Sequence, residues 1–284
     1  MVTNTPLKTF TIAHSPDPDD AYMFYGFACG TVTLPGYEVK HFLADIQTLN
    51  ERARQGEFEV SAISAHAYPS VSDKYWILNA GASVGRGYGP LIIVRPEREA
   101  ELKDRIASLK IAVPGPLTTA TLLLNIRFPG AQKVMTPFDQ IPEAVRSGKV
   151  DAGLVIHESQ LTYEKQGFKK IFDFGLWWQE EYNLPLPLGL DVVRKDLGME
   201  FARVVAKALE QSIRCAYANE KESIAYALQF GRGIDAEVGK KFVGMYVNDD
   251  TLDMGEEGRK ALQLLYRLGH ERGLIQTIPE IKTI

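Results

Sequence analysis

The sequence predicts an α/β protein made of two similar lobes around a central cleft. Short apolar segments alternate with helical patterns along the first two thirds of the chain. A weak internal repeat relates two of these strand–helix units, and an all-helical tail follows the last strand-like segment. Such alternation is typical of sheets covered by helices, and it predicts sheets that are mostly parallel.

The individual elements follow from apolar runs and helical periodicity. Strands are expected at 8–14, 37–43, 58–64, 76–80, 91–94, 109–113 and 151–157, and helices at 19–29, 46–55, 117–128 and 139–147. The first helix opens on an acidic turn, for which capping by Asp19 or Asp20 is expected. From Met199 onward, apolar residues recur at helical spacing, which predicts the helical tail.

The internal repeat appears when Gly56 is aligned with Gly148, an offset of 92 residues. Each copy reads as a helix, an Arg-x-Gly turn, an acidic residue and an apolar strand: LNERARQGEFEVSAIS in the first and IPEAVRSGKVDAGLVIH in the second. A strand–loop–helix precedes each copy. Two similar lobes explain this pattern; chance similarity between two strand–helix units is the alternative.

Strand-like segments at 91–97 and 189–198 bracket the second copy. We therefore expect a larger lobe formed by 1–96 plus 191–284, with its helical tail, and a smaller inserted lobe at 97–190. The bracketing segments would form a two-stranded hinge. A cleft between hinged lobes is a natural ligand site, and the hinge allows closure.

Composition and charge exclude several classes of protein. The chain has 32 basic and 36 acidic residues, a net charge of −4, so no nucleic-acid partner is expected. Cys29 and Cys215 form no CxxC pattern, and we expect two unpaired core thiols, with one disulfide as the alternative. Without a signal peptide or an apolar run long enough to span a bilayer, the protein is expected to be cytoplasmic and free of membranes.

Four segments that follow predicted strands should converge on the cleft: 15–20, 62–66, 114–120 and 157–159. In VPGPLTTA, Thr118, Thr119 and Ala120 open a helix, whose free N–H groups suit an anion such as a carboxylate. Plain N-capping by Thr118 or Thr119 is the alternative. A small carboxylated molecule is therefore the expected ligand.

His157 ends the predicted strand GLVIH and could transfer a proton near neutral pH, or be structural. Ser64 holds nearly the equivalent place in the first lobe. The segment SPDPDD at 15–20 lacks the Gly and Glu of a calcium loop, and no metal site is expected. Trp177, Trp178 and Tyr182 form either an aromatic wall over a ring or a packed hinge. These features leave enzyme and binding protein both open.

Six segments, taken together, resemble the 1,4-dihydroxy-6-naphthoate synthase family of the futalosine route to menaquinone. They are DIQTLNERA at 45–53, GASVGRGYGPL at 81–91, VPGPLTTATLLL at 113–124, GLVIHESQLTY at 153–163, WWQEEYNLPLPLG at 177–189 and YVNDDTLDMGEEGRKAL at 246–262. The resemblance implies a two-lobed, type II periplasmic-binding-protein-like fold. It also implies a lyase that needs no cofactor and cleaves cyclic dehypoxanthine futalosine to 1,4-dihydroxy-6-naphthoate, with release of dihydroxyacetone.

The same resemblance implies roles for particular residues. The histidine of the family's IHES motif, the proton acceptor, falls on His157. Substrate contacts are implied for Ala62, Ile63, Ser64, Thr119 and Ala120, with Asn50 as a further candidate. Two departures affect substrate preference: Ala62 replaces a lysine, and SPDPDD replaces a version with Cys and Asn at positions 17 and 19.

Two alternatives remain open at this point. Chorismate dehydratase of the same pathway has a related fold and also handles a carboxylated ring, although the IHES and LPLPLG segments favour the naphthoate synthase. A solute-binding protein for an aromatic carboxylate is the alternative from another class. The helical tail is a candidate surface for a homodimer.

Overall fold

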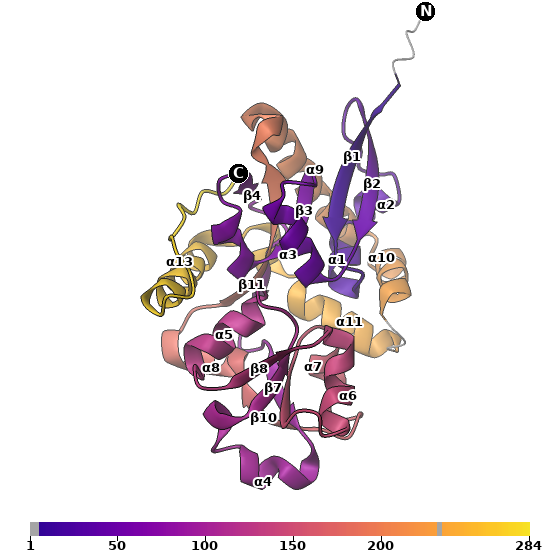
Figure 1. The fold of residues 1–284 in the computed structure, drawn as a ribbon. Helices are drawn as coiled ribbons and strands as arrows, with labels where there is room; N and C mark the ends of the chain where they lie inside the picture. The colour runs from indigo at the N-terminus through magenta and orange to yellow at the C-terminus, as the bar shows by residue number, and fades with distance from the viewer. Residues whose placement is uncertain (1–5, 232–234) are drawn as a thin grey trace, which may run out of the picture.

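A computed structural model describes residues 6–231 and 235–284 of the chain. Two sheets lie one above the other, each with helices around it (Figure 1). The first sheet has the order β2-β1-β3-β11-β4, with β5 beside β11, and the second has the order β10-β6-β9-β7-β8. The strands are β1 (Lys8–His14), β2 (Tyr37–Leu43), β3 (Val60–Ser64), β4 (Tyr75–Ile77), β5 (Ser83–Gly85), β6 (Leu91–Val94), β7 (Lys110–Val113), β8 (Gln132–Met135), β9 (Ala152–Val155), β10 (Lys169–Asp173) and β11 (Leu186–Arg194).

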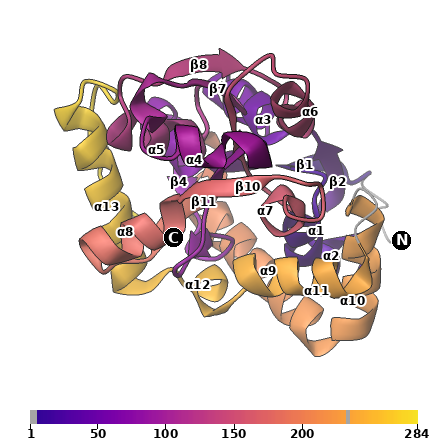
Figure 2. The ribbon, with the colours of Figure 1, turned by 90° about the horizontal axis from the view of Figure 1, so that it is seen from below.

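Helices cover both sheets and form the C-terminal tail (Figure 2). They are α1 (Pro18–Met23), α2 (Tyr25–Ala28), α3 (Ile46–Arg54), α4 (Glu99–Leu102), α5 (Thr119–Arg127), α6 (Ile141–Arg146), α7 (Ser159–Thr162), α8 (Phe174–Tyr182), α9 (Met199–Ala218), α10 (Glu220–Ala227), α11 (Ala236–Tyr246), α12 (Asp249–Leu252) and α13 (Gly255–Glu271). The α/β class and the helical tail are thus confirmed.

The expectation of mostly parallel sheets is wrong, because both sheets are mixed. β1 runs parallel to β2 and β3, and β7 runs parallel to β8 and β9. β11 is antiparallel to β3, β4 and β5, and β6 is antiparallel to β9 and β10. The chain enters β6 and β11 from the other sheet, so neither strand is reached by a helical crossover within its own sheet, the connection that joins parallel neighbours.

The two lobes repeat one another, as the sequence predicts. The order β2-β1-β3-β11 in one sheet matches β8-β7-β9-β6 in the other, direction for direction. Val60 pairs with β1 and Ala152 pairs with β7, and these two residues are separated by the predicted offset. Gly56 and Gly148 both have left-handed backbone, φ 71° and 72°, a conformation that glycine adopts without a steric penalty.

The chain crosses between the sheets twice, after β5 and before β11. Gly85 of β5 pairs with Leu186 of β11. The first crossing therefore leaves the first sheet next to the strand at which the second crossing returns. Strand pairing places residues 91–94 in the second sheet and residues 186–190 in the first. The chain thus changes sheet within 86–90 and again within 174–185. The domain limits at 97 and 190 stay a prediction.

The first predicted helix is broken in two at Phe24. Ser212 of α9 inserts a hydroxyl at this point: Ser212 Oγ donates to the carbonyl of Met23 at 2.7 Å and accepts from the amide of Gly26 at 3.0 Å. A side chain that takes over backbone partners in this way ends a regular helix. A Cβ at Gly26 would lie 2.6 Å from the Cα of Ser212, so the close approach requires glycine.

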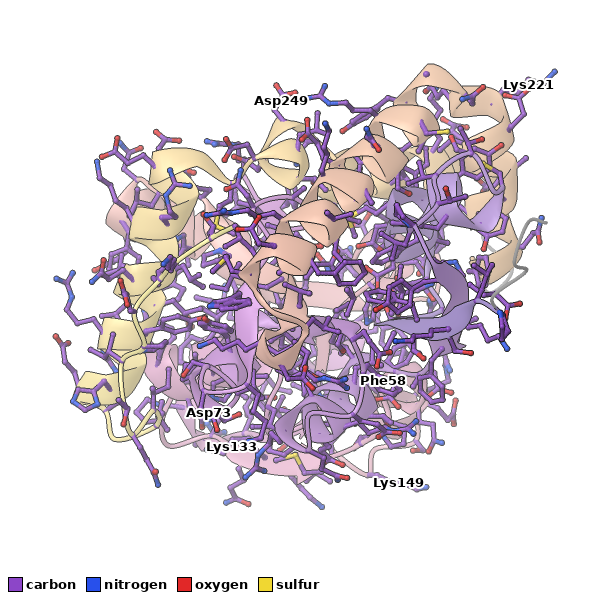
Figure 3. All side chains as sticks on the ribbon, turned by 90° about the horizontal axis from the view of Figure 1, so that it is seen from above. Phe58, Asp73, Lys133, Lys149, Lys221 and Asp249 are labelled. Carbon is purple, nitrogen blue, oxygen red and sulfur yellow. The ribbon has the colours of Figure 1, made fainter. Side chains whose placement is uncertain are left out.

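Charged side chains cover the outside of the molecule, and lysines such as Lys149 and Lys221 project from its periphery (Figure 3). Phe58 of the same view is 4% exposed and belongs to a small cluster with Leu49. Across the described part of the chain, no helix combines the length and the apolar character needed to cross a membrane.

Candidate active site

A cleft lies between the two lobes, and residues of both lobes line it. The strand-end segments that the sequence singled out supply much of its wall, as expected for α/β sheets. Helix α11 of the tail closes one side. The lining residues are Ser15, Asp17, Asp19, Asp20, Ile46, Ser64, Ser83, Pro90, Thr118, Thr119, Ala120, Ile156, His157, Gln160, Leu188, Gly189, Phe242 and Tyr246.

His157 lies in the cleft, two residues beyond the end of β9. Its backbone has φ 54°, in the left-handed region that residues other than glycine rarely adopt. The carbonyl of His157 accepts from the amide of Gln160 at 3.1 Å, which ties this turn to α7. The imidazole lies edge-on to the ring of Phe138, and its Nδ1 is 2.9 Å from Oδ2 of Asp17.

The segment SPDPDD is a buried acidic cluster at the N-terminal end of α1. The expectation that Asp19 or Asp20 caps this helix is wrong. Oδ2 of Asp20 accepts from the amide of Ser15 at 2.7 Å, and Ser15 Oγ donates to Oδ2 of both Asp17 and Asp20, at 2.6 and 2.9 Å. Asp17 takes the N-cap position without making a side-chain cap bond. These carboxyl groups therefore serve the cleft rather than the helix.

Burial and mutual repulsion give the three carboxyl groups different pKa values. Burial alone would raise the pKa of Asp17, but the charge and hydrogen bond of His157 outweigh it, so this pKa lies below its ordinary value. Burial, followed by repulsion from Asp17 and Asp20, raises the pKa of Asp19. Burial and the charge of Asp17 raise the pKa of Asp20 to about 7. One ionised carboxylate thus faces His157, beside two carboxyl groups that tend to hold a proton.

A retained proton also resolves an apparent defect in the cluster. Oδ1 of Asp17 and Oδ1 of Asp19 are buried and have no hydrogen-bond donor among the described residues. The two carboxyl groups are in hydrogen-bonding contact with each other. A proton on Asp19 lets this residue donate to Asp17, which satisfies both groups. One carboxyl oxygen from each of Asp17, Asp19 and Asp20 lies within 4.8 Å of the other two, so the three acids form one cluster.

The N-terminal end of α5 forms another part of the cleft wall. Capping by Thr118 is confirmed, since its Oγ1 accepts from the amide of Thr121 at 3.3 Å. Thr119 Oγ1 donates to the carbonyl of Leu188 at 2.7 Å and accepts from the amide of His66 at 3.1 Å. Both hydroxyls are therefore used within the protein. An anion here would be held by amides of the first helical turn, near Thr119 and Ala120.

The segment 62–64 contributes one residue to the cleft. Ser64 lines it, whereas Ala62 and Ile63 are 6% and 0% exposed and belong to hydrophobic clusters. Asn50 is fully buried and acts through Ser64: its Nδ2 donates to Ser64 Oγ at 3.0 Å and its Oδ1 accepts from the Ser64 amide at 2.8 Å. Contact of Ala62, Ile63 and Asn50 with a substrate remains a prediction.

The helical tail supplies site residues that the sequence analysis missed. Phe242 and Tyr246 of α11 line the cleft, one helical turn apart. The hydroxyl of Tyr246 and the side-chain amide of Gln160 form a hydrogen bond of 2.7 Å, which joins the tail to the second lobe. The apolar spacing of α11 predicts a buried face, but nothing local in the sequence indicates which lobe that face covers.

Two further sequence interpretations are settled by burial. Trp178 is fully buried, and its Nε1 donates to the carbonyl of Pro185 at 3.0 Å, so the aromatic pair packs the hinge region rather than the cleft. Trp177 and Tyr182 pack against the same cluster. Cys29 and Cys215 are free thiols, but Cys29 is exposed, so its place in the core was predicted wrongly.

The fold and the site together define a class: a two-lobed binding-protein architecture that carries a histidine–carboxylate pair in its cleft. The alkanesulfonate-binding protein SsuA from Xanthomonas axonopodis pv. citri shares the fold, with a TM-score of 0.71 and 12% identity over 98% of this chain and 97% of that one. Protein AF1704 from Archaeoglobus fulgidus is more similar, with a TM-score of 0.89 and 46% identity over 94% and 98%.

Sequence comparison identifies the family. The model of the menaquinone biosynthesis family matches residues 10–271, and the chain belongs to that family. Two curated relatives carry the name 1,4-dihydroxy-6-naphthoate synthase. The one from Thermus thermophilus is 36% identical over 96% of this chain and 98% of its own, and the one from Streptomyces coelicolor is 37% identical over 95% and 96%.

Proposed function

We propose that this protein is a 1,4-dihydroxy-6-naphthoate synthase, a cytoplasmic lyase that cleaves cyclic dehypoxanthine futalosine and releases dihydroxyacetone. The observation that carries the proposal is the position of His157, which lies in the interlobe cleft with one ring nitrogen against a buried carboxylate. The names of two full-length relatives support the same reaction.

His157 is the general base of the proposed reaction. Nδ1 is engaged by Asp17, so Nε2 is the nitrogen that would accept a proton from the sugar-derived part of the substrate. Loss of that proton allows the adjacent carbon–carbon bond to break. The electron pair of the broken bond passes to the ring side, and formation of the aromatic ring provides driving force. The step is redox-neutral and needs no external oxidant or reductant.

The cleft offers separate places for the two ends of such a substrate. The amides at the start of α5 suit the carboxylate, and Ile156, Leu188 and Phe242 provide apolar surface for the ring. The polar groups near Ser15 and Asp20 lie on the side of His157, where the hydroxylated fragment would be held. In such a complex the reacting carbons would lie beside the base, and the carboxylate would lie at the start of α5.

Contacts across the cleft indicate how the substrate would be enclosed. Besides the pair between Asp17 and His157, the amide of Leu117 donates to Oε1 of Gln47 at 3.0 Å. The amide of His66 also reaches Thr119 of the other lobe. A closed cleft excludes water and fixes the reacting groups relative to each other.

Product analysis by mass spectrometry tests this function. Purified protein is incubated with cyclic dehypoxanthine futalosine, without added metal or nucleotide, and separately with chorismate. The proposal predicts dihydroxynaphthoate and dihydroxyacetone from the first substrate and no loss of water from the second. Water loss from chorismate would assign the dehydratase instead. Tight binding with both compounds returned unchanged would assign a solute-binding protein.

A further inference from the structure

We propose that Asp17 is the positioning residue of His157, and that it completes the general base across the two lobes. This inference rests on the proposed function. Asp17 belongs to the loop between β1 and α1 of the first lobe, whereas His157 follows β9 of the second. Their contact, Nδ1 to Oδ2 at 2.9 Å, therefore spans the cleft.

The contact determines which nitrogen of His157 can act as a base. An ionised carboxylate only accepts hydrogen bonds, so the hydrogen of a neutral imidazole must lie on Nδ1. Nε2 then carries the lone pair that takes a proton. When the imidazole becomes positively charged, the same carboxylate stabilises it. Asp17 therefore favours one tautomer of the ring and supplies a counter-ion 2.9 Å from Nδ1.

Asp17 itself is held firmly and kept ionised. It is 1% exposed and lies between Pro16 and Pro18, whose rings restrict the backbone on both sides. Ser15 Oγ donates to the same Oδ2 that faces His157, and the carboxyl group of Asp19 also contacts that of Asp17. These contacts orient the carboxylate without neutralising it.

His157 is held from its own lobe as well. Its left-handed backbone turns the side chain out of the line of β9, and the bond from the amide of Gln160 maintains that turn. The ring of Phe138 packs against the imidazole. A strained backbone at a cleft residue is typical of a side chain whose direction matters for function.

Several ionisable groups surround the pair and enter any pH dependence. Asp17, Asp19 and Asp20 approach from the loop before α1, and Tyr246 lines the same cleft from α11. Glu158 follows His157 in the chain and is buried. Oδ2 of Asp17 lies 2.9 Å from Nδ1 of the imidazole, so removal of the Asp17 charge should change the titration of His157.

The test compares wild type with Asp17→Asn, which keeps the size of the side chain and removes its charge. Nitrogen-15 NMR of labelled histidines reports the tautomer and titration midpoint of His157 without any substrate, and His157→Asn assigns the signal. We expect the wild-type ring to carry its proton on Nδ1. In Asp17→Asn this preference should be lost, and the midpoint should fall by about one pH unit or more.

Kinetics provide the second readout. For Asp17→Asn we expect kcat to fall about 10²-fold or more, with KM changed by less than about threefold, because the base rather than binding is affected. Asp250→Asn is the matched control: this carboxylate is 7% exposed and pairs with Arg86, away from the cleft. The control should lower stability while the His157 titration and kcat stay unchanged.

The outcomes separate this inference from the proposed function. A wild-type midpoint and tautomer in Asp17→Asn, or an unchanged kcat and pH profile, would overturn the positioning role. If wild type makes no dihydroxynaphthoate while Asp17→Asn still changes the His157 titration, the proposed function fails and the pair stands. Loss of folding in Asp17→Asn is detected by circular dichroism, and Asp17→Ser then replaces it in the same NMR comparison.

Discussion

Replacing Asp20 with asparagine should stabilise the protein at alkaline pH far more than at acid pH. Burial and the charge of Asp17 raise the pKa of Asp20 from 3.8 to about 7 in the folded chain. Asparagine removes the ionisable group but keeps an oxygen that can accept from the amide and hydroxyl of Ser15, now made at 2.7 and 2.9 Å. The substitution therefore isolates the charge.

The sign follows from proton linkage. Between pH 4 and 7 the folded chain retains a proton on Asp20 that the unfolded chain has released, so wild type loses stability as pH rises through this window. The variant has no such proton. Each pH unit in the window corresponds to about 1.4 kcal/mol. From pH 5 to pH 8 the advantage of Asp20→Asn should therefore grow by about 2–3 kcal/mol.

Urea denaturation at pH 5 and pH 8 measures this difference. The quantity compared is the free energy of unfolding of the variant minus that of wild type, so other titrating groups largely cancel. Asp73→Asn is the control, because the Asp73 side chain is 71% exposed and should give the same small difference at both pH values. An equal difference for Asp20→Asn at pH 5 and pH 8 would refute the raised pKa of Asp20 on which the site description depends.

Three substitutions test how the scaffold holds the site, each by urea denaturation. Gly81→Ala should lower the free energy of unfolding by more than about 3 kcal/mol, because φ is +92° and a Cβ would lie 2.1 Å from Oδ2 of Asp191. A loss below about 1 kcal/mol would contradict the close approach. Trp178→Phe should lower the free energy of unfolding by about 1–3 kcal/mol, because it deletes the hydrogen bond to the carbonyl of Pro185 and leaves a void. An unchanged KM would agree with the position of Trp178 outside the cleft. Asp45→Ala should cost about 1 kcal/mol, since Asp45 Oδ1 accepts two amides at the start of α3; no loss would mean that solvent replaces the cap.

Much of the fold could be predicted because its strands are short apolar runs bounded by polar turns. Residues 37–43 and 91–94 form strands with the predicted limits, and the two halves of the repeat have one strand order. Periodicity could not show the break at Phe24, because it depends on Ser212, which lies far along the chain. Strand direction was missed for a similar reason, since it depends on where the chain crosses between lobes.

The site was predictable at the level of single residues but not of contacts. The position of His157 after a strand placed it in the cleft, and the structure agrees. Local sequence favoured helix capping for the aspartates of SPDPDD, because acidic residues commonly open helices. Their true partners, Ser15 and His157, become apparent only when burial and the approach of the second lobe are known.

The contribution of α11 shows the same limit. Phe242 and Tyr246 have the spacing of an ordinary buried helix face, and nothing in that spacing distinguishes core from cleft. The bond between Tyr246 and Gln160 joins segments that only the tertiary fold brings together.

The most direct test of the central claim is the turnover of cyclic dehypoxanthine futalosine by wild type, His157→Asn and His270→Asn, with substrate affinity measured in parallel. His270 lies on α13, outside the cleft lining, and serves as the control. The proposed base predicts dihydroxynaphthoate from wild type and the control, and a loss of about 10²-fold or more in kcat for His157→Asn with binding retained. Wild-type turnover by His157→Asn would contradict the account, since the proton would then be taken by another group.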